Sequence, residues 1–210
     1  MEWFLLTGQP QTGKTTVVKK TLSLLKQQGI LPQPRGFITE ERINAQGKRC
    51  GFNIQTVGLS KEQTITFATK TKKTKYKTGQ YFVDPEPLDT VGVDSISHSS
   101  KVGKSLYVID EIGRMEMHST KFKSRIVEML EDNDCVVIGT VAAPRYGHVV
   151  PLAETVKANR RVNVYHIKKS TRDEVCARFQ EDVLQYLQRS GGVTRSKQSG
   201  VEAMGVEAHD

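Results

Sequence analysis

The sequence predicts an α/β fold, a three-layer sandwich with a mainly parallel sheet and an antiparallel hairpin addition. Short continuous apolar runs alternate with segments of helical periodicity over most of the chain. Such strands are buried on both faces, which is typical of a parallel sheet covered by helices. Between residues 35 and 84, strand-like segments instead follow one another without a helix. That succession favours antiparallel pairing in this part of the sheet.

The expected elements follow from apolar periodicity and from turn residues. Strands are expected at 3–7, 35–42, 50–57, 64–69, 80–83, 105–109, 135–141 and 162–167. Helices are expected at 14–28, 119–130, 151–159 and 171–188, with a weak helix and loop over 85–99. Glu174 would complete a capping box from Thr171. We expect one domain over 1–189 and a disordered tail over 190–210, where apolar periodicity is missing.

Composition limits the classes of protein to consider. No run of eighteen apolar residues occurs in the 210-residue sequence, which argues against a membrane-spanning helix. The three cysteines, Cys50, Cys135 and Cys176, fit neither a zinc site nor a disulfide framework. We therefore expect a reducing compartment, cytoplasm or nucleus, and a protein without a membrane partner. We expect a monomer, although the sequence does not fix the oligomeric state.

A net charge of +8 invites a nucleic-acid hypothesis. Much of the excess lies in a lysine cluster, defined here as Lys70, Lys72, Lys73, Lys75 and Lys77. A solvated strand or loop is the favoured interpretation of this cluster. A polynucleotide partner remains the alternative.

A phosphate-binding loop is the first chemical motif. The consecutive residues Gly8, Gln9, Pro10, Gln11, Thr12, Gly13, Lys14 and Thr15 fit G-x-x-x-x-G-K-[ST] in full, and Thr16 follows. Backbone N–H groups of such a loop point at the phosphates, and the next helix adds its dipole. Lys14 would neutralise the β- and γ-phosphate oxygens, and the Thr15 hydroxyl would bind Mg²⁺.

A second motif follows at the end of a later buried strand. We expect the segment made of Tyr107, Val108, Ile109, Asp110, Glu111, Ile112, Gly113 and Arg114 to border the nucleotide. Asp110 would hold Mg²⁺ through water, and Glu111 would orient and polarise the attacking water. An acid beside the metal-binding aspartate is typical of water-activating P-loop enzymes. By analogy, the strand at 135–141 should lie between the first strand and the Asp110 strand. Thr140 at its tip is either a γ-phosphate sensor or a strand-ending threonine.

Five segments, TGQPQTGKTT, GFITEER, GKRCGF, GQYFVD and VIDEIGRME, occur in an order that resembles the cancer-related nucleoside-triphosphatases. The resemblance covers residues 3 to 188. It implies a P-loop fold and slow, magnesium-dependent hydrolysis of several nucleoside triphosphates with loose base selectivity. It also places Gly8, Gly13, Lys14, Thr15 and Thr16 on the nucleotide loop, and Asp110 and Glu111 on the magnesium and catalytic positions. The family loop often reads G-P-P-G-V-G-K-T, so Gln11 replaces a glycine here. Its side chain would narrow the loop or add an amide near the γ-phosphate.

Several other candidates have ordinary structural interpretations. Glu40 and Glu41 close a strand, and a polar strand end is favoured over a role beside the site. Glu116 is expected to provide helix-start electrostatics. Arg160 and Arg161 would contact a base or phosphate, but an exposed pair at a helix end is the favoured interpretation.

Two other functions compete with hydrolysis. A nucleotide or nucleoside kinase would need an acceptor pocket and an arginine-rich lid, and no such lid lies between the motifs. A nucleotide-dependent RNA-associated module would use the lysine cluster, but no RNA-binding motif accompanies it.

Overall fold

The computed structural model describes residues 2–30, 33–59, 61–97 and 104–190. Its strands are β1 (Trp3–Thr7), β2 (Arg35–Ile43), β3 (Arg49–Val57), β4 (Thr64–Thr69), β5 (Tyr76–Thr78), β6 (Tyr81–Val83), β7 (Ser105–Ile112), β8 (Cys135–Val141) and β9 (Val162–His166). Its α-helices are α1 (Lys14–Gln27), α2 (Val93–Ser95), α3 (Thr120–Glu131), α4 (Pro151–Ala158) and α5 (Arg172–Arg189). One sheet joins the strands in the order β5-β6-β4-β3-β2-β7-β8-β1-β9.

The parallel part of the sheet runs from β2 to β9. All neighbouring strands from β2 through β7, β8 and β1 to β9 pair in parallel. Every residue of β1 and of β8 is buried, as their continuous apolar sequences require. β8 lies between β1 and β7, so the predicted strand insertion is confirmed.

The antiparallel part contains one strand more than the sequence predicted, and it is joined to the parallel part differently. β3, β4, β6 and β5 follow β2 in antiparallel pairs, and the short strand β5 was not predicted as a separate element. β2 belongs to both parts, because its residues Arg35 to Ile38 pair in parallel with β7 while the strand pairs antiparallel with β3. The expectation that the whole region from 35 to 84 is an antiparallel addition is therefore wrong for β2.

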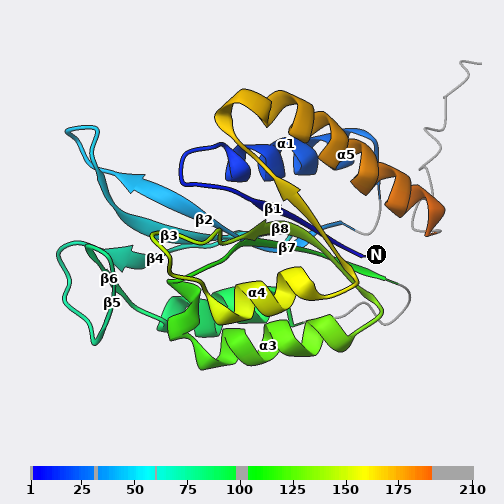
Figure 1. The fold of residues 1–210 in the computed structure, drawn as a ribbon. Helices are drawn as coiled ribbons and strands as arrows, with labels where there is room; N and C mark the ends of the chain where they lie inside the picture. The colour runs from blue at the N-terminus through cyan, green and yellow to red at the C-terminus, as the bar shows by residue number, and fades with distance from the viewer. Residues whose placement is uncertain (1, 31–32, 60, 98–103, 191–210) are drawn as a thin grey trace, which may run out of the picture.

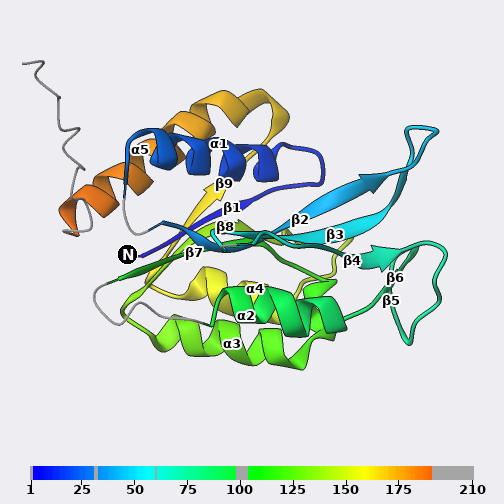
Figure 2. The same ribbon diagram turned by 180° about the vertical axis from the view of Figure 1, so that it is seen from behind.

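Helices cover both faces of the sheet (Figure 1). α1 and α5 lie on one face, and α3 and α4 lie on the other, with α2 beside α3 (Figure 2). Each face has its own buried cluster, one around Phe37, Tyr107 and Phe122 and the other around Val18, Val108 and Phe179. The three-layer α/β prediction is confirmed. No helix in the described ranges is long and apolar enough to cross a membrane.

Three segments show how the local predictions compare with the structure. β7 continues past Ile109 to Ile112, with an irregular register against β8 between these two residues. The weak helix predicted after Pro85 is a π-helical turn (Leu88–Gly92) that leads into α2. The capping box predicted from Thr171 does not form, because its hydroxyl instead accepts from the Lys168 backbone N–H at 3.3 Å within a 3₁₀ turn. The predicted tail lies outside the described residues apart from Ser190, so the domain boundary stays a prediction.

Candidate functional site

The phosphate-binding loop joins β1 to α1 at the carboxyl edge of the parallel strands. Gly13 caps α1 with φ of 98°, a left-handed conformation that favours glycine. The Lys14 ammonium folds over the loop and donates to the carbonyl oxygens of Gly8 at 3.0 Å and Gln9 at 3.4 Å. The Thr12 hydroxyl also donates to Gln9 O at 2.9 Å. These bonds hold the cation and the loop backbone together at the start of α1, with Thr15 and Thr16 in its first turn.

Gln11 occupies the loop position at which the resembling family often has glycine. Its φ is 64°, so a residue with a side chain adopts the left-handed conformation here. The side chain is exposed and lines the cleft beside the loop. Pro10 is exposed next to it, and the Gln9 amide reaches Pro144 O at 3.4 Å. The left-handed backbone thus supplies a physical reason for the family glycine at position 11.

Asp110 is buried at the carboxyl end of β7, with 2% of its surface exposed. Its Oδ1 accepts from the Thr140 hydroxyl at 2.5 Å, whereas its Oδ2 has no hydrogen-bond partner among the described residues. Burial raises the pKa of Asp110, and the hydroxyls of Thr140 and Thr15 and the charges of Lys14 and Lys19 oppose that rise. Thr140 is therefore more than a strand-ending threonine, because its hydroxyl orients the Asp110 carboxylate.

Glu111 follows Asp110 across a cis peptide bond, and its partly exposed side chain lies near a buried acid, Glu116. Burial raises the pKa of Glu111, which the charge of Lys14 partly offsets. Glu116 is only 4% exposed, and a β-carbon placed at Gly113 would come within 3.0 Å of its Oε2 and 3.3 Å of the Glu111 side chain. Burial and the Glu111 charge raise the pKa of Glu116 to about 8.

Glu116 does begin a helix, as expected, but this helix is a short 3₁₀ turn and not α3. α3 begins four residues later and is capped by Ser119, whose hydroxyl accepts from Phe122 N at 2.8 Å. A 3₁₀ turn (Glu116–His118) instead turns the Glu116 carboxylate toward Glu111. Sequence reasoning missed this pair because the five-residue spacing matches neither strand nor helix periodicity. The apolar residues on either side of Glu116, Met115 and Met117, are the one feature of the sequence that indicates its burial.

A cleft of about 370 Å³ lies beside the loop. It is lined by Gln11, Gly13, Lys14, Thr15, Thr16, Lys19, Thr39, Glu40 and Glu41. Glu40 forms an ion pair with Lys19 of α1, and Glu41 forms one with Arg49 of β3. Both acids lie on the part of β2 that extends past its pairing with β7, so they end the strand, as favoured, and also line the cleft.

The remaining residues of the second motif divide by their surroundings. Tyr107, Val108, Ile109 and Ile112 are fully buried in the two cores, so their side chains support Asp110 and do not face a ligand. The prediction that these residues border the nucleotide is therefore wrong for their side chains. Arg114 is exposed, and its guanidinium donates at 3.1 Å to the carbonyl oxygens of Arg145 and His148, which brace a tight turn beside the loop.

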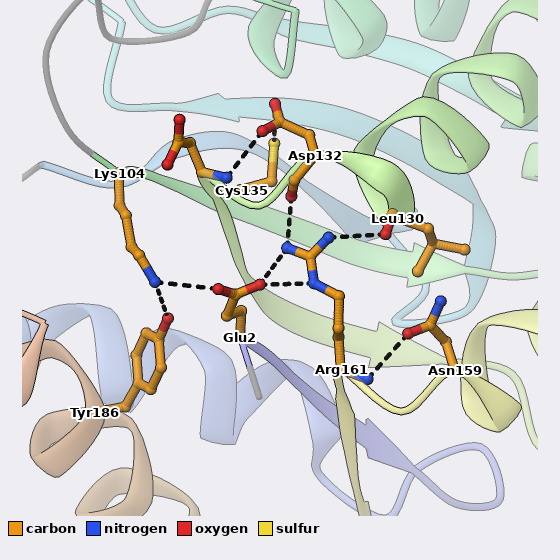
Figure 3. Close-up of polar contacts among 9 residues, drawn as sticks. Glu2, Lys104, Leu130, Asp132, Cys135, Asn159, Arg161 and Tyr186 are labelled. Atoms are coloured by element: carbon orange, nitrogen blue, oxygen red, sulfur yellow. Dashed lines mark hydrogen bonds and ion pairs between the residues drawn. The ribbon is translucent and has the colours of Figure 1, made fainter.

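Arg161 is far from the site. Its guanidinium binds Glu2, which precedes β1, and donates to Leu130 O at 2.8 Å and to Asp132 O at 2.5 Å (Figure 3). These contacts lie at the amino end of β1, whereas the phosphate-binding loop follows its carboxyl end. Arg160 is exposed at the same distant edge. The suggestion that this pair contacts a nucleotide is wrong, and so is the favoured description of Arg161 as exposed.

The fold and this site define a P-loop nucleotide-binding protein of the α/β class, with Asp110 and Glu111 beside the loop. The family described as NTPase matches residues 3–179 of the chain. The chain belongs to this family of nucleoside-triphosphatases.

Similar proteins occur in bacteria and in animals. Nucleoside-triphosphatase THEP1 of Thermotoga petrophila is 36% identical over 81% of this chain and 87% of its own length. The human cancer-related nucleoside-triphosphatase is 30% identical over 81% of this chain and 90% of its own. The crystal structure of THEP1 from Aquifex aeolicus matches 89% of this chain and 99% of that one, with a TM-score of 0.73 and 27% identity. The sequence-based family resemblance is confirmed.

Proposed function

We propose that the protein hydrolyses nucleoside triphosphates to diphosphate and phosphate with Mg²⁺ as cofactor. The observation that carries the proposal is the placement of Asp110 and Glu111 beside Lys14, whose charge opposes the rise that burial causes in the pKa of both acids. The names of the relatives, nucleoside-triphosphatases in bacteria and in humans, support the same reaction.

The residues present fit a magnesium ion. Mg²⁺ prefers oxygen ligands and is usually held by one or two carboxylates together with substrate phosphates. Asp110 offers a buried oxygen without a protein partner, and the Thr15 hydroxyl lies close enough to lower its pKa. Among the described residues no cluster of three or more acidic, histidine or cysteine side chains could hold a metal, so substrate oxygens would complete the set. When bound, the ion would neutralise negative charge on the phosphate oxygens.

Residues of the chain itself would bind the phosphates and activate the water. Lys14, which now donates to loop carbonyls, would exchange these bonds for β- and γ-phosphate oxygens, and loop N–H groups would stabilise charge that develops on the leaving diphosphate. Glu111 would hold the attacking water and accept its proton. Glu116, buried against Glu111, would restrict where that carboxylate can move.

Two other functions, a kinase and an RNA-associated module, can be distinguished from hydrolysis. A kinase would need an acceptor beside the γ-phosphate in place of water, and no observation favours it over hydrolysis. An RNA-associated module has one observation in its favour: three lysines of the lysine cluster lie over aromatic rings, Lys70 over Tyr81, Lys75 over Tyr76 and Lys77 over Phe82. In each pair the lysine lies over one face of the ring, so that face is not free to stack on a base.

A phosphate-release assay tests the proposal. We expect release from ATP, GTP, CTP and UTP, with kcat/KM values within about two decades, or about 3 kcal/mol, since no base-specific motif is present. Addition of a nucleoside monophosphate should not divert the phosphate. Transfer to that acceptor instead of water would establish the kinase alternative.

A further inference from the structure

The connection between β9 and α5 contacts both glycines of the phosphate-binding loop. A β-carbon placed at Gly8 would come within 2.4 Å of the carbonyl oxygen of Ile167. A β-carbon placed at Gly13 would come within 2.8 Å of Cδ of Arg172 and 3.8 Å of its Nη1. The Arg172 side chain therefore lies directly across the backbone at the start of α1. Glycine at position 13 leaves the space that this side chain occupies.

The strand order indicates which end of a nucleotide lies near Arg172. β1 is between β8 and β9 in the sheet. The groups proposed to act at the γ-phosphate, Asp110 and Glu111, come from β7, on the β8 side of the loop. A triphosphate that reaches them would leave its nucleoside on the opposite side, toward β9. Arg172 is the first residue of α5 and lies on that side, in contact with the loop.

The Arg172 guanidinium is available for a ligand. Half of its side chain is exposed, and its ion-pair partner, Asp173, is 3.6 Å away and 90% exposed. Such a solvated pair contributes little and is easily exchanged. A guanidinium is planar and stacks on aromatic faces, including those of all nucleobases. Contact through the ring face does not read hydrogen-bonding groups, so it would accept any base.

We propose that Arg172 is the base-contacting residue of the site and stacks on the nucleobase of bound nucleoside di- and triphosphates without reading the hydrogen-bonding groups of the base. The inference rests on the proposed function only in taking the phosphates to lie in the loop. It replaces Arg160 and Arg161, which the fold places at the opposite edge of the sheet.

Equilibrium binding of the reaction products tests the contact between Arg172 and the base without requiring turnover. Titration calorimetry would measure the affinities of Mg²⁺–ADP, Mg²⁺–CDP and Mg²⁺–pyrophosphate, which carry a large base, a small base and no base. We expect Arg172→Ala to weaken ADP binding about 3- to 30-fold, the usual range for such a contact, CDP less, and pyrophosphate not at all. Arg178→Ala, on the same helix and paired with Asp182, is the matched control and should change none of the three.

The charge-preserving variant Arg172→Lys separates stacking from charge. Lysine keeps the cation but lacks the planar guanidinium, so it should lose most of the ADP affinity that alanine loses. Equal weakening of ADP and pyrophosphate, with rescue by lysine, would show a phosphate contact and overturn the proposal. Unchanged ADP binding in Arg172→Ala would overturn it as well. A parent protein that binds ADP with this dependence on Arg172 but releases no phosphate from triphosphates would overturn the hydrolase proposal alone.

Discussion

Asp110 and Glu111 are adjacent in the chain, but their surroundings suit them to different tasks. Asp110 has one oxygen bound to Thr140 and one oriented without a protein partner, which suits a fixed metal ligand. Glu111 is partly exposed and has Lys14 and Glu116 as neighbours, which suits a group that handles water. Each side chain at the site can therefore be tested for a separate contribution.

Lys14→Ala should lose most of the triphosphate affinity and nearly all turnover. The ammonium is the cation that the loop itself holds in place, through Gly8 O and Gln9 O. Calorimetry and phosphate release would measure both effects, with the exposed Lys26→Ala on the same helix as control. Normal binding and hydrolysis by a folded Lys14→Ala protein would contradict the assignment of the phosphate-binding loop.

Glu111→Gln should separate hydrolysis from binding. The amide keeps the shape but removes the proton acceptor, so single-turnover hydrolysis should fall by roughly 10²–10⁴-fold while substrate affinity survives. Asp110→Asn should instead weaken the magnesium-triphosphate complex, with partial recovery in excess Mg²⁺. If Glu111→Gln hydrolyses at the parental rate, another acid must hold the water, and Glu116 and Glu41 are the next candidates.

Glu116 should make the stability of the nucleotide- and metal-free protein depend on pH. Its pKa is about 8 in the folded protein against 4.5 ordinarily, so the protonated form favours the folded state. The contribution is full below pH 4.5 and is lost as the pH rises through about 8. At pH 7 the loss would be about 3 kcal/mol as an upper bound.

Glu116→Gln is permanently neutral, so it should remove this slope. Urea unfolding of the parent and the variant at several pH values between 5 and 8.5 would measure the difference in the free energy of unfolding. Parallel pH profiles for the two proteins would mean that Glu116 is ionised in the fold.

At the scale of elements, the predictions from sequence were best where a continuous local pattern determines the environment of a segment. The continuous apolar runs predicted β1, β7 and β8, and Glu111 beside Asp110 predicted the insertion of β8 between the other two. Contacts across loops were not predictable from local patterns. Glu116 lies near Glu111 because of a 3₁₀ turn, and Arg172 contacts Gly13 from the start of α5, which is distant in the sequence. Thr171 had an alternative donor, the Lys168 N–H, which no helix-capping pattern reveals.

The lysine cluster belongs to the antiparallel extension formed by β4, β5 and β6. Its members are exposed, and Lys72 has an ion-pair partner, Asp84, at 3.5 Å. Replacing all five lysines with glutamine should leave triphosphate hydrolysis within a few-fold of the parent at physiological salt. Affinity of the parent for RNA or DNA that falls steeply with salt, and that the variant loses, would instead favour the nucleic-acid function.

At the scale of the whole molecule, the proposed nucleotide site and a network of structural ion pairs lie at opposite edges of the sheet. The phosphate-binding loop, Asp110 and Glu111 follow the carboxyl ends of parallel strands. At the amino ends, Glu2 joins Arg161 and Lys104, and the Lys104 ammonium also donates to the Tyr186 hydroxyl at 2.5 Å (Figure 3). This network links the start of β1 to α5 and to the segments that precede β7 and β9. It should therefore affect stability without affecting catalysis.

Arg161→Ala tests that separation. The Arg161 side chain is 13% exposed, and its removal would leave Glu2 without one partner and the carbonyl oxygens of Leu130 and Asp132 without their donors. Loss of one member of a largely buried pair costs about 3 kcal/mol, so urea unfolding near pH 7 should show a decrease of that order. Nucleotide affinity and kcat, measured well below the unfolding transition, should stay at parental values. The exposed neighbour Arg160→Ala is the control and should change neither property.

The pH dependence of this loss has a definite sign. Burial alone would raise the pKa of Glu2, but hydrogen bonds from Lys104 and Arg161 outweigh it and hold the pKa below its ordinary value of 4.5. The ionised carboxylate therefore stabilises the folded protein above about pH 4.5, and this contribution disappears as the pH falls through the lowered pKa. The difference in unfolding free energy between parent and Arg161→Ala should accordingly be larger at pH 7 than at pH 3. A difference independent of pH would assign the loss to the two carbonyl contacts, and a fall in nucleotide affinity would show that the two edges of the sheet are coupled.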